Sequence, residues 1–289
     1  MRVTRRRVLA GAAGLLGLSA AATAGYATGI EPQGLVVTRY VPNPSGWPAR
    51  RKLSVAVIAD IHAGGPDMTL LHIRRVVDTA NALKSDLIVL LGDYTATYRF
   101  ATRIPNATWA AELARLTAPL GTWSILGNHD WWHDVADIRR ALTDVHNSHP
   151  GKRCGDAWCR GERFWLAGLG DQIAYRLGQG RFRGVDDLAG TLAQVRADDP
   201  VLLLAREPDI FPRVPPRVAL TLSGHTHGGQ IRLPLIWPAL VPSRYGARFA
   251  YGHVVENDRH PIVSGGLGTS VVPARLGVPP EIVHIVLGA

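Results

Sequence analysis

Two histidines that lie one residue apart, His225 and His227, are the strongest candidates for metal ligands in this sequence. They stand in the glycine-rich segment 224–230, directly after the apolar run 218–222. Along an extended backbone the side chains of residues i and i+2 point the same way, so both imidazoles could face one ion or two adjacent ions. The glycines add no side-chain bulk, so the backbone can turn sharply and a ligand can come close. Two histidines are too few for a metal site, and the alternative is a loop with two solvated histidines.

More candidate ligands follow three apolar runs earlier in the chain. The runs occupy residues 53–59, 86–91 and 122–126. The candidates that follow them are Asp60, His62, Asp93, Asn128 and His129. Each run has the length of a buried strand, and the spacing of apolar residues predicts helices between them at 66–84 and 108–116. Repeated strand–helix units bring polar residues to the carboxyl edge of a sheet, where α/β proteins bind ligands.

Later apolar runs extend the strand pattern to the end of the chain. We expect strands at 164–168, 200–205, 218–222, 250–256, 261–264 and 281–287, with a weak helix at 185–195. Segment 233–241 is rich in proline and in large apolar residues. We interpret it as a buried loop, in preference to an apolar lip beside the site that meets a lipid or the membrane surface.

The formal net charge of +9 belongs mostly to the N-terminal segment. Residues 1–52 hold eight basic and one acidic residue, whereas residues 53–289 hold 24 basic and 22 acidic residues. The body of the protein is therefore nearly neutral. Nucleic-acid binding depends on clustered phosphate contacts, so we expect no nucleic-acid partner.

The N-terminus resembles a twin-arginine export signal, because Arg5, Arg6 and Arg7 precede an apolar run rich in glycine and alanine. Segment 8–30 contains no charge over 23 residues, so the alternative is an uncleaved membrane anchor. We predict a signal or anchor at 1–27, a linker or extended first strand at 28–52, and one domain at 53–289. We favour export by the twin-arginine route, which would leave the domain periplasmic, otherwise extracytoplasmic, or membrane-anchored, with cleavage of the segment left open.

The two cysteines, Cys154 and Cys159, lie in a loop-like segment. Outside the cytoplasm they could close a short local disulfide, and two free thiols are the alternative. No matching cysteine or histidine pair lies near them in the sequence, which argues against a structural zinc site.

The motifs D-x-H, G-D, G-N-H-D and G-H-T-H occur in this order at 60–62, 92–93, 127–130 and 224–227. Their types and order resemble the calcineurin-like metallophosphoesterase family. Further segments, such as 242–246 and 266–270, resemble a bacterial branch of that family with twin-arginine or membrane-anchored N-termini.

The resemblance implies a four-layer α/β/β/α sandwich with a site for two divalent ions, Mn, Zn or Fe. It implies that Asp93 bridges the ions. The other ligands would be Asp60, His62 and His227 for the first ion and Asn128 and His225 for the second. Two cations about 3.5–4 Å apart clamp the phosphoryl oxygens and activate a water. His129 would stabilise the transition state or protonate the leaving oxygen.

The chain departs from the family at Arg206, where the family has a histidine. A guanidinium does not lose its proton in proteins, so it cannot ligate a metal. Either a water completes a weaker second site, or the guanidinium occupies that region and binds the phosphate as a fork. The site could then hold one ion rather than two, or lose turnover.

These observations favour a metal-dependent hydrolase of phosphate esters, in particular phosphodiesters. The substrate could be linked to a lipid or to the cell envelope. One alternative is a hydrolase of the pyrophosphate in a UDP-linked diacylated glucosamine at the membrane. The other is a phosphate- or envelope-binding protein that has lost turnover through Arg206.

Overall fold

The computed structural model describes residues 5–99, 101–143, 145, 154–159, 162–195, 199–233 and 237–289. Two β-sheets lie at its centre. The first has five strands, in spatial order β1 (Val36–Tyr40), β15 (Glu281–Leu287), β2 (Leu53–Ile58), β4 (Leu87–Leu90) and β6 (Thr122–Ser124). The second has six, in the order β13 (Gly252–His253), β14 (Pro261–Val263), β12 (Val218–Ser223), β11 (Val201–Leu204), β8 (Glu162–Gly168) and β7 (Cys154–Cys159).

Neighbouring strands that matter for the site are parallel. In the first sheet β2 pairs with β4, and β4 with β6, while β15 runs antiparallel to β2. In the second sheet β11 is parallel to both β8 and β12. The carboxyl ends of β2, β4 and β6 therefore meet at one edge of the first sheet, and those of β8, β11 and β12 meet at one edge of the second.

Alternate residues of the central strands face different layers. In β2, Val55 and Val57 pack in the cluster between the two sheets, whereas Ala56 and Ile58 pack in the cluster under the helices. This two-residue period is the geometry of a pleated strand with both faces covered. It explains why the strand reads as a continuous apolar run rather than as an alternating pattern.

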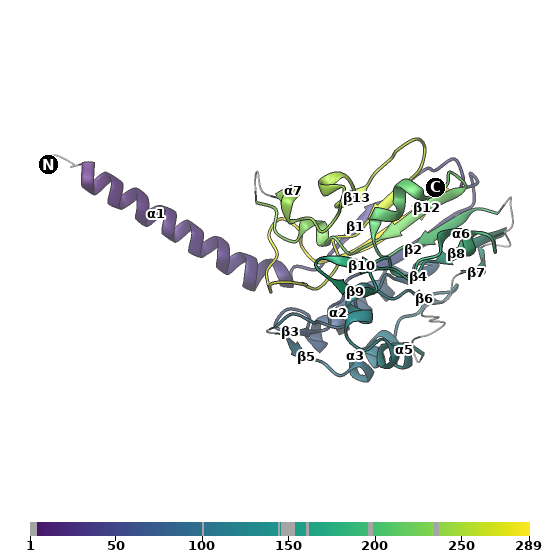
Figure 1. Cartoon of the computed structure of the whole chain (residues 1–289), viewed down its shortest axis with the longest axis horizontal. Coiled ribbons are helices and arrows are strands. Elements are labelled where there is room, and N and C mark those ends of the chain that lie inside the picture. Colours follow the sequence, from purple (N-terminus) through teal and green to yellow (C-terminus); the bar gives the residue numbers. More distant parts are fainter. Residues whose placement is uncertain are drawn as a thin grey trace.

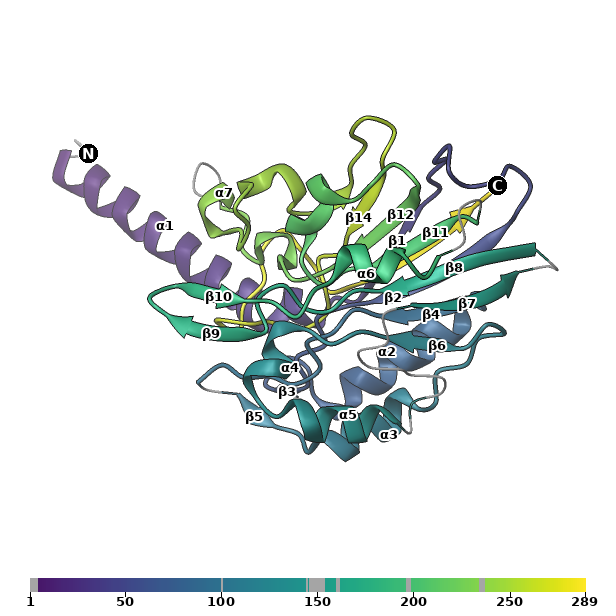
Figure 2. The same cartoon turned by 45° about the vertical axis from the view of Figure 1, so that its right-hand side comes forward.

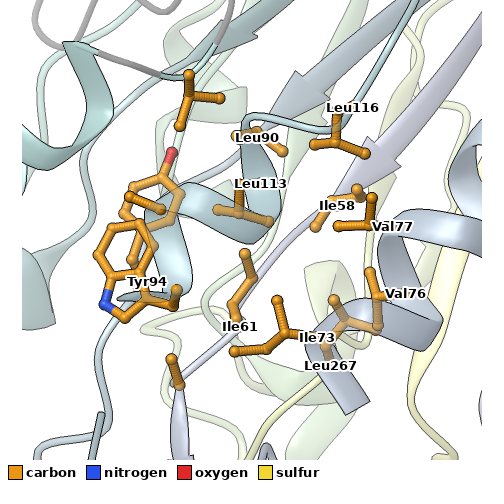
Figure 3. Packing of buried hydrophobic residues seen from close by; sticks show 14 of the residues in the cluster. Ile58, Ile61, Ile73, Val76, Val77, Leu90, Tyr94, Leu113, Leu116 and Leu267 are labelled. Carbon is orange, nitrogen blue, oxygen red and sulfur yellow. The ribbon is translucent and has the colours of Figure 1, made fainter. Parts of the chain in front are cut away.

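Helices cover both outer faces (Figure 2). Those over the first sheet are α2 (Leu70–Ala82), α3 (Asn106–Leu113) and α5 (Val135–Thr143). Those over the second are α6 (Leu188–Leu192) and the 3₁₀ helix η3 (Pro208–Arg213). Figure 3 shows Val77 of α2 beside Ile58 of β2, and Ile73 of the same helix near Ile61. The order helix, sheet, sheet, helix confirms the predicted four-layer α/β/β/α sandwich.

Helix α1 (Arg5–Gly25) projects from the body of the protein (Figure 1). Residues Gly11–Gln33 are long and apolar enough to cross a membrane, and 6% of this stretch is buried. The backbone N–H of Arg275 donates to the carbonyl of Ala27 (2.8 Å), and that of Val278 donates to Oε1 of Glu31 (2.7 Å). The base of the helix is therefore tied to one loop of the domain.

Within segment 28–52, which we expected to be a linker or an extended first strand, residues 36–40 form the strand β1, which pairs with β15. Several other elements differ from the sequence-based expectations. The hairpin of β9 (Tyr175–Gly178) and β10 (Arg181–Arg183) was not predicted, and neither were β3 (Gly64–Gly65) and β5 (Thr102–Arg103). The strand expected at 250–256 is reduced to β13. Short helical turns after β6 and β12 were also not predicted, namely α4 (Asn128–Trp132), η4 (His227–Gly229), α7 (Trp237–Leu240) and η5 (Gly246–Phe249).

The loop expected around the cysteines is wrong, because residues 154–159 form β7 antiparallel to β8. A strand rises about 3.3 Å per residue, so its first and sixth Cα atoms lie ~16 Å apart. A disulfide needs Cα atoms within about 7 Å of each other. A local bond between Cys154 and Cys159 is therefore incompatible with this strand.

Candidate functional site

The predicted site residues lie in loops at the carboxyl ends of the central strands. Asp60 and His62 follow β2, Asp93 follows β4, and Asn128 and His129 begin α4 after β6. From the second sheet, Arg206 follows β11, and both His225 and His227 follow β12. The structure brings all eight residues of the two sheets together at one end of the sandwich, as the contacts below describe.

Three of these residues form a buried cluster with the composition of a metal site. Nε2 of His227 lies 3.1 Å from Oδ1 of Asp60 and 3.2 Å from Nε2 of His62. One possible ligand atom from each residue lies within 4.8 Å of the others. Asp93 adds a carboxylate oxygen 3.7 Å from Nε2 of His62. Mixed imidazole and carboxylate ligands suit Mn, Fe or Zn, so these residues fit one divalent cation.

The protonation states of this cluster suit a metal. Burial and the neighbouring His129 hold the pKa of His62 well below its ordinary value, which favours the neutral imidazole that can ligate. Burial acts to raise the pKa of Asp60, but attraction to Arg206 and His227 outweighs it and holds this pKa well below its ordinary value. Burial also acts to raise the pKa of Asp93, but attraction to Arg206 outweighs it and lowers this pKa. Both carboxylates are therefore charged at neutral pH.

Arg206 is buried between the two carboxylates, with 1% of its surface exposed. Its Nη2 donates to Oδ1 of Asp60 (2.5 Å) and to Oδ2 of Asp93 in a short contact. Burial acts to lower the pKa of Arg206, but the two carboxylates raise it overall, so the side chain stays charged. A cation already bridges the oxygens that a second metal would need. The residues present do not fit a second divalent ion beside this guanidinium.

Asn128 and His225, predicted as ligands of the second ion, contact each other instead. Nδ1 of His225 lies 3.1 Å from Oδ1 of Asn128, and the backbone N–H of His225 donates to Oδ2 of Asp60 (3.1 Å). Burial and Arg206 lower the pKa of His225 to about 4. A neutral imidazole and an amide are hydrogen-bonding groups that can bind phosphoryl oxygens.

His129 lies beside the cluster and has one free ring nitrogen among the described contacts. Its Nδ1 forms a short hydrogen bond with Oγ1 of Thr97, and its backbone N–H donates to Oδ1 of Asp93 (2.9 Å). Its ring lies 4.8 Å from that of His62, close enough that His62, Asp93 and His129 form a second potential ligand group. Burial lowers the pKa of His129, although Asp93 opposes this shift. Thr97 carries no sequence signal, since a single threonine in a loop is ordinary.

The site depends on unusual backbone conformations. Five of its residues have positive φ: Asp60 (53°), His62 (44°), Asp93 (57°), His225 (71°) and His227 (51°). Non-glycine residues in this region are uncommon and are concentrated at functional sites. The extended backbone assumed for His225 and His227 is therefore wrong, and their imidazoles point to different groups. At Gly224 an added Cβ would lie 2.5 Å from Oδ2 of Asp60, so this close approach requires glycine.

Asp130 holds the loops of the site together. One of its oxygens accepts hydrogen bonds from the backbone N–H groups of Asp93 (2.8 Å) and Gly127 (2.8 Å), and the other from that of Tyr94 (2.9 Å). Burial and repulsion from Asp93 raise the pKa of Asp130 to about 7. Asp130 belongs to the G-N-H-D motif, but the motif alone did not indicate that it accepts these backbone hydrogen bonds.

Behind His227 lies a second buried arginine, Arg275, which the sequence analysis missed. Its Nη2 lies 3.4 Å from Nδ1 of His227 and also donates to the carbonyls of Gly265 and Gly268. Burial lowers the pKa of Arg275 to about 10. The contact orients the ring of His227 so that Nε2 faces Asp60.

A cavity of about 760 Å³ opens beside these residues. Its walls include Asn128, His129, His225 and His227. Glu207 also lines it, but its Oε2 accepts from the backbone N–H of Gln172 (2.9 Å). Arg206 is not among the lining residues, so its guanidinium lies beneath the cavity and the predicted fork to phosphate is not formed here.

Comparisons with known proteins identify the family of this chain. A model of the family described as calcineurin-like phosphoesterase matches residues 53–229. The chain is 30% identical to the uncharacterized metallophosphoesterase YkuE of Bacillus subtilis over 295 residues, which cover 97% of this chain and 96% of that protein. It is also 30% identical to a Danio rerio transmembrane protein with a metallophosphoesterase domain, covering 81% of this chain but 53% of that protein. A solved dimetal phosphatase from Danio rerio is 12% identical, with a TM-score of 0.41, and the match covers 74% of this chain and 88% of that one.

Proposed function

The chain belongs to the calcineurin-like phosphoesterase family, and we propose that it hydrolyses phosphodiesters with a single divalent metal ion and Arg206 in place of a second. The observation that carries this proposal is the buried cluster of Asp60, His62 and His227, of which His227 reaches the wall of a cavity. A phosphodiester has two ester arms, and a cavity of about 760 Å³ leaves room for both.

The metal would be held by Asp60, His62 and His227, with the carboxylate of Asp93 close to His62. When bound, such an ion supplies a Lewis acid and lowers the pKa of a water to near neutrality. Asn128 and His225 then bind and orient the phosphoryl oxygens from the cavity wall. Since the hydrogen bond to Thr97 engages Nδ1 of His129, Nε2 is the atom that gives a proton to the leaving oxygen.

Arg206 supplies the charge that a second metal would provide. With one divalent ion, two aspartates and one guanidinium, the buried charges sum to +1, whereas a single ion and two aspartates would sum to zero. A net positive site favours a phosphate and the negative charge that develops in its transition state. Because the guanidinium is fixed on both carboxylates, it acts through them as a positioning residue and does not need to touch the substrate.

Metal content tests this proposal independently of turnover. We expect elemental analysis of the protein purified without chelator to give one Mn, Fe or Zn per chain. The Arg206→His variant restores a neutral ligand and should take up two. With Mn(II), electron paramagnetic resonance should show an isolated ion in the original protein and a spin-coupled pair in the variant. Two ions in the original protein would refute the replacement of the second metal.

Hydrolysis of bis-p-nitrophenyl phosphate tests the activity itself. Removal of metal with a chelator should abolish turnover, and added Mn or Zn should restore it. Asp60→Asn should remain inactive under all conditions. If no metal supports turnover while phosphate still binds, the protein is instead a phosphate- or envelope-binding protein. That second candidate is favoured by one observation, the internal pairing of Arg206 with both carboxylates.

We further propose that the N-terminal segment holds the domain at a membrane. The apolar helix and the resemblance of residues 5–7 to a twin-arginine motif support export with an uncleaved anchor. Protease treatment of spheroplasts would test this, because an exported domain is degraded and a cytoplasmic one is protected.

A further inference from the structure

The cavity beside the metal cluster has a polar floor and an apolar mouth. Asn128 and His227, 1% and 3% exposed, lie at its buried end. Toward solvent it is lined by Phe182 (42% exposed), Leu240 (46%) and Val271 (78%). Val272 and Ile173 belong to the same wall. Exposed apolar side chains next to a polar site indicate that the ligand has an apolar part as well as a phosphate.

The mouth lies on the side of the domain from which α1 projects. Hairpin β9–β10 and helix α7 lie on this side in both views (Figure 1, Figure 2). One loop joins the mouth to the base of the helix, because Ser270, Val271 and Val272 line the cavity and Arg275 and Val278 bond to residues 27–31. The helix that is long enough to cross a membrane is thus tied to the wall of the cavity.

The hairpin has the composition of a surface that contacts lipid headgroups. Its exposed apolar side chains are those of Tyr175, Leu177 and Phe182. Arg176 lies between the first two in the sequence, and Arg181 and Arg183 flank the third. Phe182 and Arg176 are cross-strand partners that both stack on Trp132 at the cavity wall. Aromatic and aliphatic side chains interleaved with arginine favour the interface of an anionic bilayer.

We propose that the cavity binds the hydrocarbon chain of a membrane lipid whose phosphodiester is the substrate. The phosphate would meet the floor of the cavity and the chain would lie along Phe182, Leu240 and Val271. This inference rests on the proposed function, because it assigns a substrate class to the same site. It explains why an apolar mouth, a basic hairpin and a membrane-length helix occupy one side of the molecule.

Varying the length of the alkyl chain of the substrate tests the proposal. The full-length protein in lipid nanodiscs is loaded with metal and given two soluble diesters, methyl and octyl p-nitrophenyl phosphate. Burial of each methylene favours binding by about fourfold, so we expect kcat/KM for the octyl ester to be at least on the order of 100-fold higher. Equal values for the two esters would overturn the proposal.

Substitutions at and away from the mouth of the cavity test where the alkyl chain of the substrate binds. Val271→Asp should reduce the octyl-to-methyl ratio about tenfold or more, whereas Val255→Asp should leave it unchanged. Val255 is a matched control, because it is 55% exposed but does not line the cavity. Equal effects of the two variants would overturn the assignment of the mouth.

Binding of octylphosphonate and methylphosphonate, measured by calorimetry, separates this inference from the activity. These probes cannot be hydrolysed at their C–P bond. A strong preference for the octyl compound without any turnover would refute the proposed function and retain the site for the alkyl chain, whereas turnover without such a preference would do the reverse.

A final experiment compares hydrolysis of a phosphodiester lipid in the same nanodisc as the protein with hydrolysis of the same lipid in separate vesicles. Faster hydrolysis in the same disc supports delivery from the bilayer that holds α1, and equal rates would refute it.

Discussion

Replacing Arg206 with glutamine should make the stability of the domain depend strongly on metal. Removing one partner from a buried ion pair costs about 3–5 kcal/mol, because the other charge is left without compensation. Here two carboxylates are left, and both lie within hydrogen-bond reach of one guanidinium nitrogen. At ~5 Å and an effective dielectric constant of about 20, their mutual repulsion is ~3 kcal/mol. We therefore expect Arg206→Gln to lose about 3–5 kcal/mol of unfolding free energy without metal.

Added metal should then restore much of this loss. An ion at 100 times its Kd stabilises the folded state by about 2.7 kcal/mol, and in the variant a second ion can bind where the guanidinium was. The difference in unfolding free energy between the original protein and the Arg206→Gln variant should therefore be smaller in saturating Mn(II) than in chelator, by roughly that amount. Urea unfolding of the detergent-solubilised chain, followed by tryptophan fluorescence, measures both values.

Arg259→Gln is the control for this experiment. Arg259 donates to the carbonyls of Phe211, Pro212 and Val214, away from the metal cluster. Its loss should destabilise the protein equally with and without metal. If Arg206→Gln costs less than about 1 kcal/mol in chelator, or if its cost is the same in Mn(II), the guanidinium is not the counter-ion of the two carboxylates.

Two further predictions concern the site histidines. His129→Gln should lower kcat by about 100-fold or more with metal content unchanged. The loss should be larger for an alkyl leaving group than for p-nitrophenolate, because p-nitrophenolate needs no proton. Equal losses for both leaving groups would contradict the assignment of Nε2 as the acid. The pKa of His225 falls from 6.5 to about 4 on folding, so the unfolded chain binds the extra proton first and the stability of the metal-free protein should fall as the pH drops from about 6.5 toward 4, by up to ~3 kcal/mol. His225→Asn should flatten that dependence in pH-controlled urea titrations, and an unchanged slope would contradict the burial of a neutral imidazole.

The sequence predicts the frame of this molecule well where both faces of a strand are covered. The run 53–59 could be recognised because every position of β2 has an apolar or small side chain, and Asp60 then marks where the strand ends. Strand β1 and the hairpin β9–β10 carry exposed residues without such a run, so nothing in their local pattern distinguishes them from loops. Their positions depend on partners far away in the sequence.

The sequence predicts which residues form the site better than it predicts how these residues contact one another. Residue types and order indicated which side chains gather, but the direction of Arg206 depends on the packing of β11 against β12. Only the structure places its Nη2 on Asp60 and Asp93 rather than toward the cavity. The left-handed backbone at His225 and His227 also could not be predicted from their spacing, because the rule that residues i and i+2 point the same way holds only for an extended chain.

The place of β15 between β1 and β2 has a consequence for the order of folding and metal uptake. The first sheet joins residues 36–40 to residues 281–287, so it cannot close until residue 287 has left the ribosome. Pairings of such long sequence separation form slowly. Asp60 and His62 stand at the end of β2, directly beside the strand that arrives last, and a metal taken up earlier would meet an incomplete site. Metal loading therefore belongs after the synthesis of β15 and its insertion between β1 and β2.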